Sequence, residues 1–137
     1  MTASPQDVMT AKLFFKAAFP VMQVLMDDDP KLNKKFAKFR AIVQFGTMDD
    51  QEPLFCQLVF SNGKVAILHS KADKPDLALT FGSIAKMNAL LKGGMTLPSI
   101  KGRLSLLPNV LALLGALRIM TKDNDKLNDP VHRLSDN

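Results

Sequence analysis

The sequence is poor in cysteine and lacks the two largest aromatic residues. Its 137 residues include one Cys, no Trp and no Tyr. A single cysteine excludes an internal disulfide bond and a zinc site built from several cysteines. The absence of Trp and Tyr removes the usual stacking platform for single-stranded nucleic acid, although the nine Phe could in principle serve. We therefore expect no nucleic acid partner.

Long uninterrupted apolar segments are also missing. Lys12 and Lys16 interrupt the apolar run at residues 13–15, so we expect no signal peptide and a cytoplasmic protein. The charge-free stretch 104–117 contains Pro108 and Asn109 and is shorter than the roughly 20 apolar residues that cross a bilayer. This stretch is therefore not predicted to span a membrane.

The overall composition is that of one soluble globular domain, with 47% apolar and 23% charged residues. The net charge of +5 arises in one segment, because residues 31–40 hold five basic residues and no acid, whereas the other basic residues are balanced by the 13 acids. The simpler interpretation of this segment is a solvated helix face. The functional alternative is docking on an anionic membrane surface. The residues that would make this contact are Lys31, Lys34, Lys35 and Lys38.

The spacing of apolar residues predicts an alternation of helices and strands. A helix over 5–27 should be kinked or split at Pro20, and a short basic helix should follow Pro30. We divide the chain into a helical extension (1–20), one domain (21–120) and a polar tail (121–137). Strands are predicted from residue 39 to about 46, over 54–60, 65–69 and 77–81, and from 100 to 106, with helices from Ser83 to Lys92 and from Pro108 to about Met120.

The second and third strands are joined by a strong hairpin signal. Asn62 and Gly63 tolerate the positive φ angles of a type I′ turn. This turn sets a register in which Phe60 pairs with Val65, Leu58 with Ile67, and Cys56 with His69. Both faces of this sheet are strongly apolar, so we expect both to be covered, and a partner chain is one candidate for this cover.

The last predicted helix has no polar face over residues 110–117, so it must be covered. The simpler interpretation is a core helix or the interface of a homodimer. Alternatively, the helix is one wall of an apolar cavity, in which Ala112, Gly115 and Ala116 leave room beside the sheet. The eight Met residues fit an adaptable lining, but Met is more often ordinary core filler.

From about residue 21 to 120, the sequence resembles the sterol carrier protein type 2 family. The similar segments are QVLMDDDPKLNKKF, AIVQFGT, the hairpin around SNGKV, PDLALTFGS, IAKMNALLKGG and IKGRLSLLPN. Gly102, Arg103 and Asn109 match the family pattern, whereas Pro108 stands where a second Gly is expected. The resemblance implies an α/β (α+β) fold with a five-stranded, mostly antiparallel sheet covered by helices. It also implies a cavity between the sheet and the C-terminal helix for fatty acyl chains, sterols or related lipids.

On this resemblance we predict a binding or carrier protein for a hydrophobic ligand, which is not an enzyme and needs no cofactor. Arg103 is the nearest candidate for an anionic head group, although a solvated Arg is the simpler interpretation. The alternative function is a structural or dimerisation module. A third, implied only by the family, is an accessory subunit of enzymes that modify isoprenoid quinones or other lipids. The residues expected to line the ligand are Phe81, Met87, Leu91, Leu104, Leu106, Leu111 and Leu114.

Other candidate sites are weaker. Cys56 opposite His69 would place a thiol beside an imidazole, but no third orienting carboxylate is evident and a buried Cys is normally a small hydrophobic residue. The acidic run 27–29 lacks the spacing of a calcium loop, so no metal site is predicted.

Overall fold

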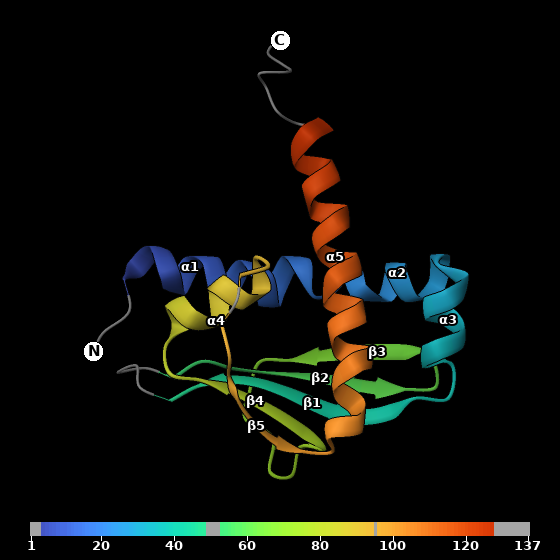
Figure 1. Ribbon diagram of the computed structural model, residues 1–137, viewed down its shortest axis with the longest axis horizontal. Coiled ribbons are helices and arrows are strands. Elements are labelled where there is room, and N and C mark those ends of the chain that lie inside the picture. The colour runs from blue at the N-terminus through green and yellow to red at the C-terminus, as the bar shows by residue number, and fades with distance from the viewer. Residues whose placement is uncertain (1–3, 49–52, 95, 128–137) are drawn as a thin grey trace.

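The computed structural model describes residues 4–48, 53–94 and 96–127, with side chains up to residue 119. It is an α+β protein in which a five-stranded sheet carries a layer of helices (Figure 1). The elements in chain order are α1 (Pro5–Leu13), η1 (Phe14–Ala18), α2 (Val21–Asp28), α3 (Pro30–Phe36), β1 (Arg40–Thr47), β2 (Phe55–Ser61), β3 (Lys64–Leu68), β4 (Leu77–Phe81), α4 (Ile84–Leu91), β5 (Ser99–Gly102), η2 (Leu104–Leu106) and α5 (Leu107–Leu127).

The strands lie in the order β3-β2-β1-β4-β5. The central pair β1 and β4 is parallel, and the other three pairs are antiparallel. The predicted hairpin is confirmed, because Phe60 pairs with Val65 and Leu58 with Ile67. The predicted pair of Cys56 with His69 is wrong, because β3 ends at Leu68 and the ladder ends with Gln57 and Leu68. Asn62 and Gly63 have φ angles of 48° and 82°, as the predicted turn requires.

The N-terminal helical segment breaks before Pro20, as predicted. Pro20 has no amide proton, and the turn that precedes it widens into the π-helix η1, in which the Phe19 amide donates to the Phe14 carbonyl oxygen at 2.8 Å. The segment resumes as α2, which contacts β3 through Gln23. The Gln23 side-chain amide donates to the Gly63 carbonyl oxygen (3.0 Å) and accepts from the Val65 amide (2.7 Å). This pair of hydrogen bonds holds the hairpin under the helical layer.

The helices cover only one face of the sheet, and cover of the other face by a partner chain stays a prediction. We call the face that packs against the helices the inner face and the opposite one the outer face. The crossover between β3 and β4, residues 69–76, runs across the outer face below the sheet (Figure 1). It is held there by hydrogen bonds from the Ala72 amide to Gln44 Oε1 (2.7 Å) and from Gln57 Nε2 to the Ser70 carbonyl oxygen (3.2 Å).

The predicted fifth strand is too long. The strand β5 ends at Gly102, whose φ of 106° turns the chain away from the sheet, and residues 104–106 form the 3-10 turn η2 instead of strand. A Cβ at residue 102 would collide with the Asp76 carbonyl oxygen, so glycine is required at this position. The last helix is longer than predicted, because α5 continues through Leu127 where a polar tail was expected from Thr121.

Candidate functional site

The structure brings five of the seven predicted ligand residues into one hydrophobic core, between the inner face and the helices. Three of these five residues lie on β4 and α4, and two lie on η2 and α5. Each of these side chains is at most 5% exposed, so in this structure they pack as core residues. They are Phe81, Met87, Leu91, Leu106 and Leu114.

The other two predicted ligand residues lie at the surface. Leu104 in η2 is 61% exposed and Leu111 in α5 is 43% exposed. Leu104 is exposed because β5 ends early. A strand that continued through residue 106 would have placed Leu104 on the same face as the buried Leu106. The assignment of all seven residues to a ligand stays a prediction.

Helix α5 packs with one side only. Its buried residues Val110, Leu113, Leu114 and Leu117 recur at the spacing of a single helix face. Near the end of that face, the Arg118 guanidinium donates to the Leu90 carbonyl oxygen of α4 at 3.2 Å. Beyond this point α5 continues past the other helices (Figure 1). The core therefore covers only one side of the apolar segment 110–117.

The three small residues of α5 have different surroundings. Ala116 packs against the core and Gly115 is half-buried, but Ala112 is exposed and does not face the sheet.

A pocket of about 370 Å³ opens beside Phe81, where the ends of β1 and β4 meet the start of α4. Phe81 is the single predicted ligand residue in its lining. Sequence reasoning missed the other residues because they come from three separate chain segments (48, 80–86 and 97–101) and share no local pattern. They are Met48, Thr80, Gly82, Lys86, Leu97, Ser99 and Lys101.

The basic residues proposed for membrane contact lie together on and after α3. Lys31, Lys34, Lys35 and Lys38 are all exposed, while Leu32 and Phe36 of the same segment are buried. Such exposure is equally compatible with a solvated helix face and with a face that contacts a membrane. Arg103 is exposed, and its backbone amide donates to the Asp76 carbonyl oxygen at 2.7 Å.

The acidic run before α3 has a structural role. Asp29 is the N-cap of α3, since its carboxylate accepts from the Lys31 amide (2.9 Å) and the Leu32 amide (3.4 Å). Within the described ranges, His, Cys, Asp and Glu side chains form no group of three able to hold a metal ion.

The thiol of Cys56 is not poised for nucleophilic chemistry. It is fully buried on the inner face, and burial raises its pKa from 9.0 to about 12. His69 follows the last residue of β3 and is exposed. A thiol kept protonated in this way behaves as a small core residue.

The test for membrane spans gives a limited result. Within the described part of the chain, no single helix is long and apolar enough to cross a membrane. One bent pair, Pro5–Ala18 with Val21–Asp28, meets the length and composition test. The apolar side of that pair is buried against the core through Phe15, Phe19 and Met22.

Comparison with solved structures identifies the architecture. The sterol carrier protein domain 2 of Helicoverpa armigera superposes with a TM-score of 0.56 at 18% identity, over 86% of this chain and 94% of that one. A crystal structure of sterol carrier protein 2 gives 0.58 at 14% identity, over 77% and 97%. This chain has the sterol carrier protein 2 fold.

A third solved structure with this fold is a conserved hypothetical protein from Thermus thermophilus. Its TM-score is 0.50 at 14% identity, over 76% of this chain and 87% of that one. At the level of sequence, no family model and no curated protein matches the chain. The sterol carrier protein 2 fold is thus established by three-dimensional likeness.

Proposed function

We propose that this protein is a non-enzymatic, cytoplasmic carrier that binds a hydrophobic ligand between the inner face of the sheet and α5. The ligand class is a fatty acyl chain, a sterol or an isoprenoid-type lipid. Support comes from the fold, which is shared with proteins described as sterol carrier proteins. The observation in this chain that carries the proposal is the segment 110–117 of α5, which is apolar on every side although only one side is packed.

A ligand would enter by displacing α5 from the inner face. The proposed walls, such as Met87, Leu106 and Leu114, are in one core in this structure, so space has to be opened. Buried Met22, Met26 and Met87 favour this, because unbranched thioether side chains repack around irregular shapes. The ligand's apolar area would contribute about 25 cal/mol per Å² buried, less the cost of ordering.

Contact with an anionic membrane through Lys31, Lys34, Lys35 and Lys38 is part of the proposal. Their exposure on one segment supports it, and each basic side chain near such a surface contributes about 1 kcal/mol. A carrier needs this kind of transient contact to load and unload.

A structural or dimerisation module, or an accessory subunit of a lipid-modifying complex, is the second candidate. It is favoured by three large apolar side chains exposed on η2 and α5, namely Leu104 (61%), Leu111 (43%) and Ile119 (66%). A second protein surface that covered them would remove this area from water.

Native mass spectrometry of the freshly purified protein, with analysis of its organic extract, tests the proposal. A constant added mass that disappears on extraction supports the carrier and gives the ligand class. A clean unliganded mass, no uptake of added fatty acid or sterol, and a dimer that survives dilution would favour the second candidate instead.

The absence of Trp and Tyr allows a residue-level test. In Leu114→Trp, the introduced indole is the only strong fluorophore and occupies the proposed site. We expect its emission to shift on lipid addition, or lipid uptake to fall because the larger side chain fills the space. The matched control is Ile119→Trp on the exposed side of the same helix, which should leave uptake unchanged. Ala116→Trp is the substitute if Leu114→Trp does not fold.

A further inference from the structure

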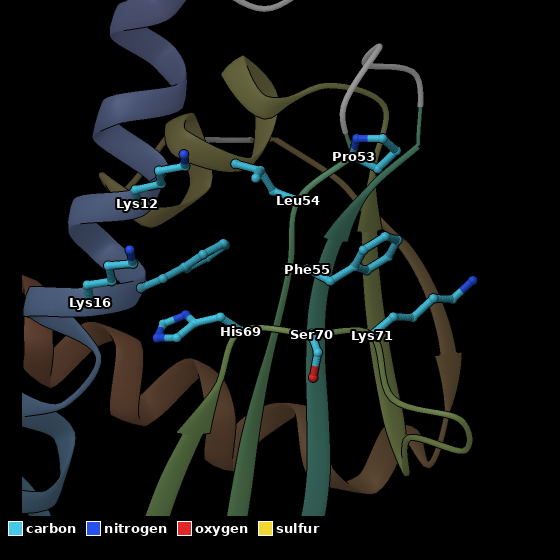
Figure 2. Close-up of a pocket in the computed structure, with 9 residues that line it drawn as sticks. Lys12, Lys16, Pro53, Leu54, Phe55, His69, Ser70 and Lys71 are labelled. Atoms are coloured by element: carbon cyan, nitrogen blue, oxygen red, sulfur yellow. The ribbon is translucent and has the colours of Figure 1, made fainter.

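A second pocket lies where α1 and η1 approach the start of β2 and the residues that follow β3 (Figure 2). Its volume is about 290 Å³. It shares no residue with the predicted site between the sheet and α5. The lining residues are Lys12, Phe15, Lys16, Pro53, Leu54, Phe55, His69, Ser70 and Lys71.

The pocket has an apolar floor. Phe15 is 3% exposed and belongs to the core, and the half-buried Leu54 packs against that core from the start of β2. The π-helical turn supplies Phe15 to the floor and Lys16 to the rim. An ordered π turn inside a helical segment is uncommon and is frequently found at functional sites.

The rim of the pocket is basic. Figure 2 shows Lys12 and Lys16 projecting from the helix, with His69 reaching toward them from the end of β3. The Lys71 and Phe55 side chains point away from the helix, and there the Lys71 ammonium lies 5.4 Å from the centre of the Phe55 ring (Figure 2). Lys12, Lys16 and His69, from two distant parts of the chain, thus lie on one side of the hollow.

Among the residues that the structure describes, Lys12 and Lys16 have no counter-charge. The lining contains neither Asp nor Glu among the residues that the structure describes, and no described carboxylate forms an ion pair with Lys12 or Lys16. The sequence also has Asp49, Asp50 and Glu52 shortly before Pro53, outside the described residues. The described part of the rim therefore favours an anion over a cation or a metal ion.

The shape and chemistry together select a class of ligand. A volume of about 290 Å³ is at the lower end for small-molecule pockets. The apolar floor would not contribute to the binding of a bare inorganic anion, and the basic rim would contribute little to the binding of a neutral lipid. We propose that this pocket binds a small amphipathic anion, an organic carboxylate whose apolar body has about six to ten carbons. The carboxylate contacts Lys12 and Lys16, and the carbon chain lies on Phe15 and Leu54.

Calorimetric titration of the full chain with octanoate tests this site. Saturable binding is expected, with at least tenfold weaker binding of octan-1-ol, which lacks the charge, and of acetate, which lacks the apolar body. The double variant Lys12→Gln/Lys16→Gln should bind octanoate at least tenfold more weakly. The control Lys34→Gln/Lys35→Gln removes the same charge from exposed positions on α3 and should bind as the unmodified protein does.

A second readout locates the ligand. The chain has two His residues, so the imidazole signals of His69 can be assigned in NMR spectra by comparison with His69→Gln. They should shift on octanoate addition, and Leu114→Trp should bind octanoate as before.

The proposal would be overturned by no octanoate binding, by equal binding of octan-1-ol or acetate, or by binding that Lys12→Gln/Lys16→Gln leaves unchanged. If Leu114→Trp abolished octanoate binding and the His69 imidazole signals of the unmodified protein did not shift on octanoate addition, the ligand would occupy the site between the sheet and α5. That outcome would reject this pocket and leave the carrier function standing.

Discussion

The two faces of the sheet are held by different forces. On the inner face, β1, β2 and β4 present apolar side chains that are at most 5% exposed, such as Val43, Phe45 and Leu79. On the outer face, Leu68 is 47% exposed, while Gln44 and Gln57 are buried under the crossover and hydrogen-bonded to it. The inner face is thus stabilised by apolar burial, and the outer face by a few directional bonds to one loop.

Removing an inner-face ring gives the largest expected effect. Phe45 is fully buried, and its ring lies 5.4 Å from that of Phe19 in the helical layer. Phe45→Ala should lower the free energy of unfolding by about 3–5 kcal/mol, since it loses the burial and leaves a cavity. Leu68→Ala on the outer face should cost about 1 kcal/mol or less. Urea denaturation measures both, and equal losses would refute the contrast between the faces.

The end of the crossover is expected to matter next. Asp76 Oδ2 accepts from the Ile42 amide at 2.7 Å and thereby attaches the crossover to β1. Asp76→Ala should cost about 2 kcal/mol, because a charged acceptor is lost and the amide is left without its partner. Asp73→Ala removes an exposed carboxylate from the same loop and should change stability by about 0.5 kcal/mol or less. A similar cost for both variants would mean that the charge matters rather than the bond.

A smaller effect is expected in the middle of the crossover. Gln44→Ala removes the acceptor of the Ala72 amide and should cost about 1 kcal/mol. Hydrogen exchange at Ala72 should accelerate, while exchange at the inner-face residue Val43 stays slow. If both amides accelerated equally, the crossover and the inner face would open as one unit.

Local signals in the sequence predicted much of this architecture. The Asn62–Gly63 turn fixed the hairpin register, Pro20 marked the helix break, and alternation in residues 39–46 identified β1. Each depends on backbone preferences of a few adjacent residues, which the fold does not override.

The differences from prediction arise from contacts between distant residues. The end of β5 is set by Gly102, where the chain passes so close to Asp76 that alternation beyond it has no effect. The outer face is covered by the crossover because β4 lies beside β1, which no local pattern reveals. The basic pocket likewise joins Lys12 and Lys16 to His69, more than 50 residues away in the sequence.

The smallest expected effect concerns Cys56, which reports on the inner face through pH. Burial raises the pKa of its thiol from 9.0 to about 12, so the native thiol should be unreactive toward a disulfide reagent at pH 8 and react fully in urea. Above pH 9 the unfolded thiol loses its proton while the folded one keeps it. The unfolded state then binds fewer protons, so the free energy of unfolding falls with rising pH, by about 0.8 kcal/mol at pH 9.5. Cys56→Ala should lack this part of the pH dependence, and its persistence in that variant would assign the effect to other groups.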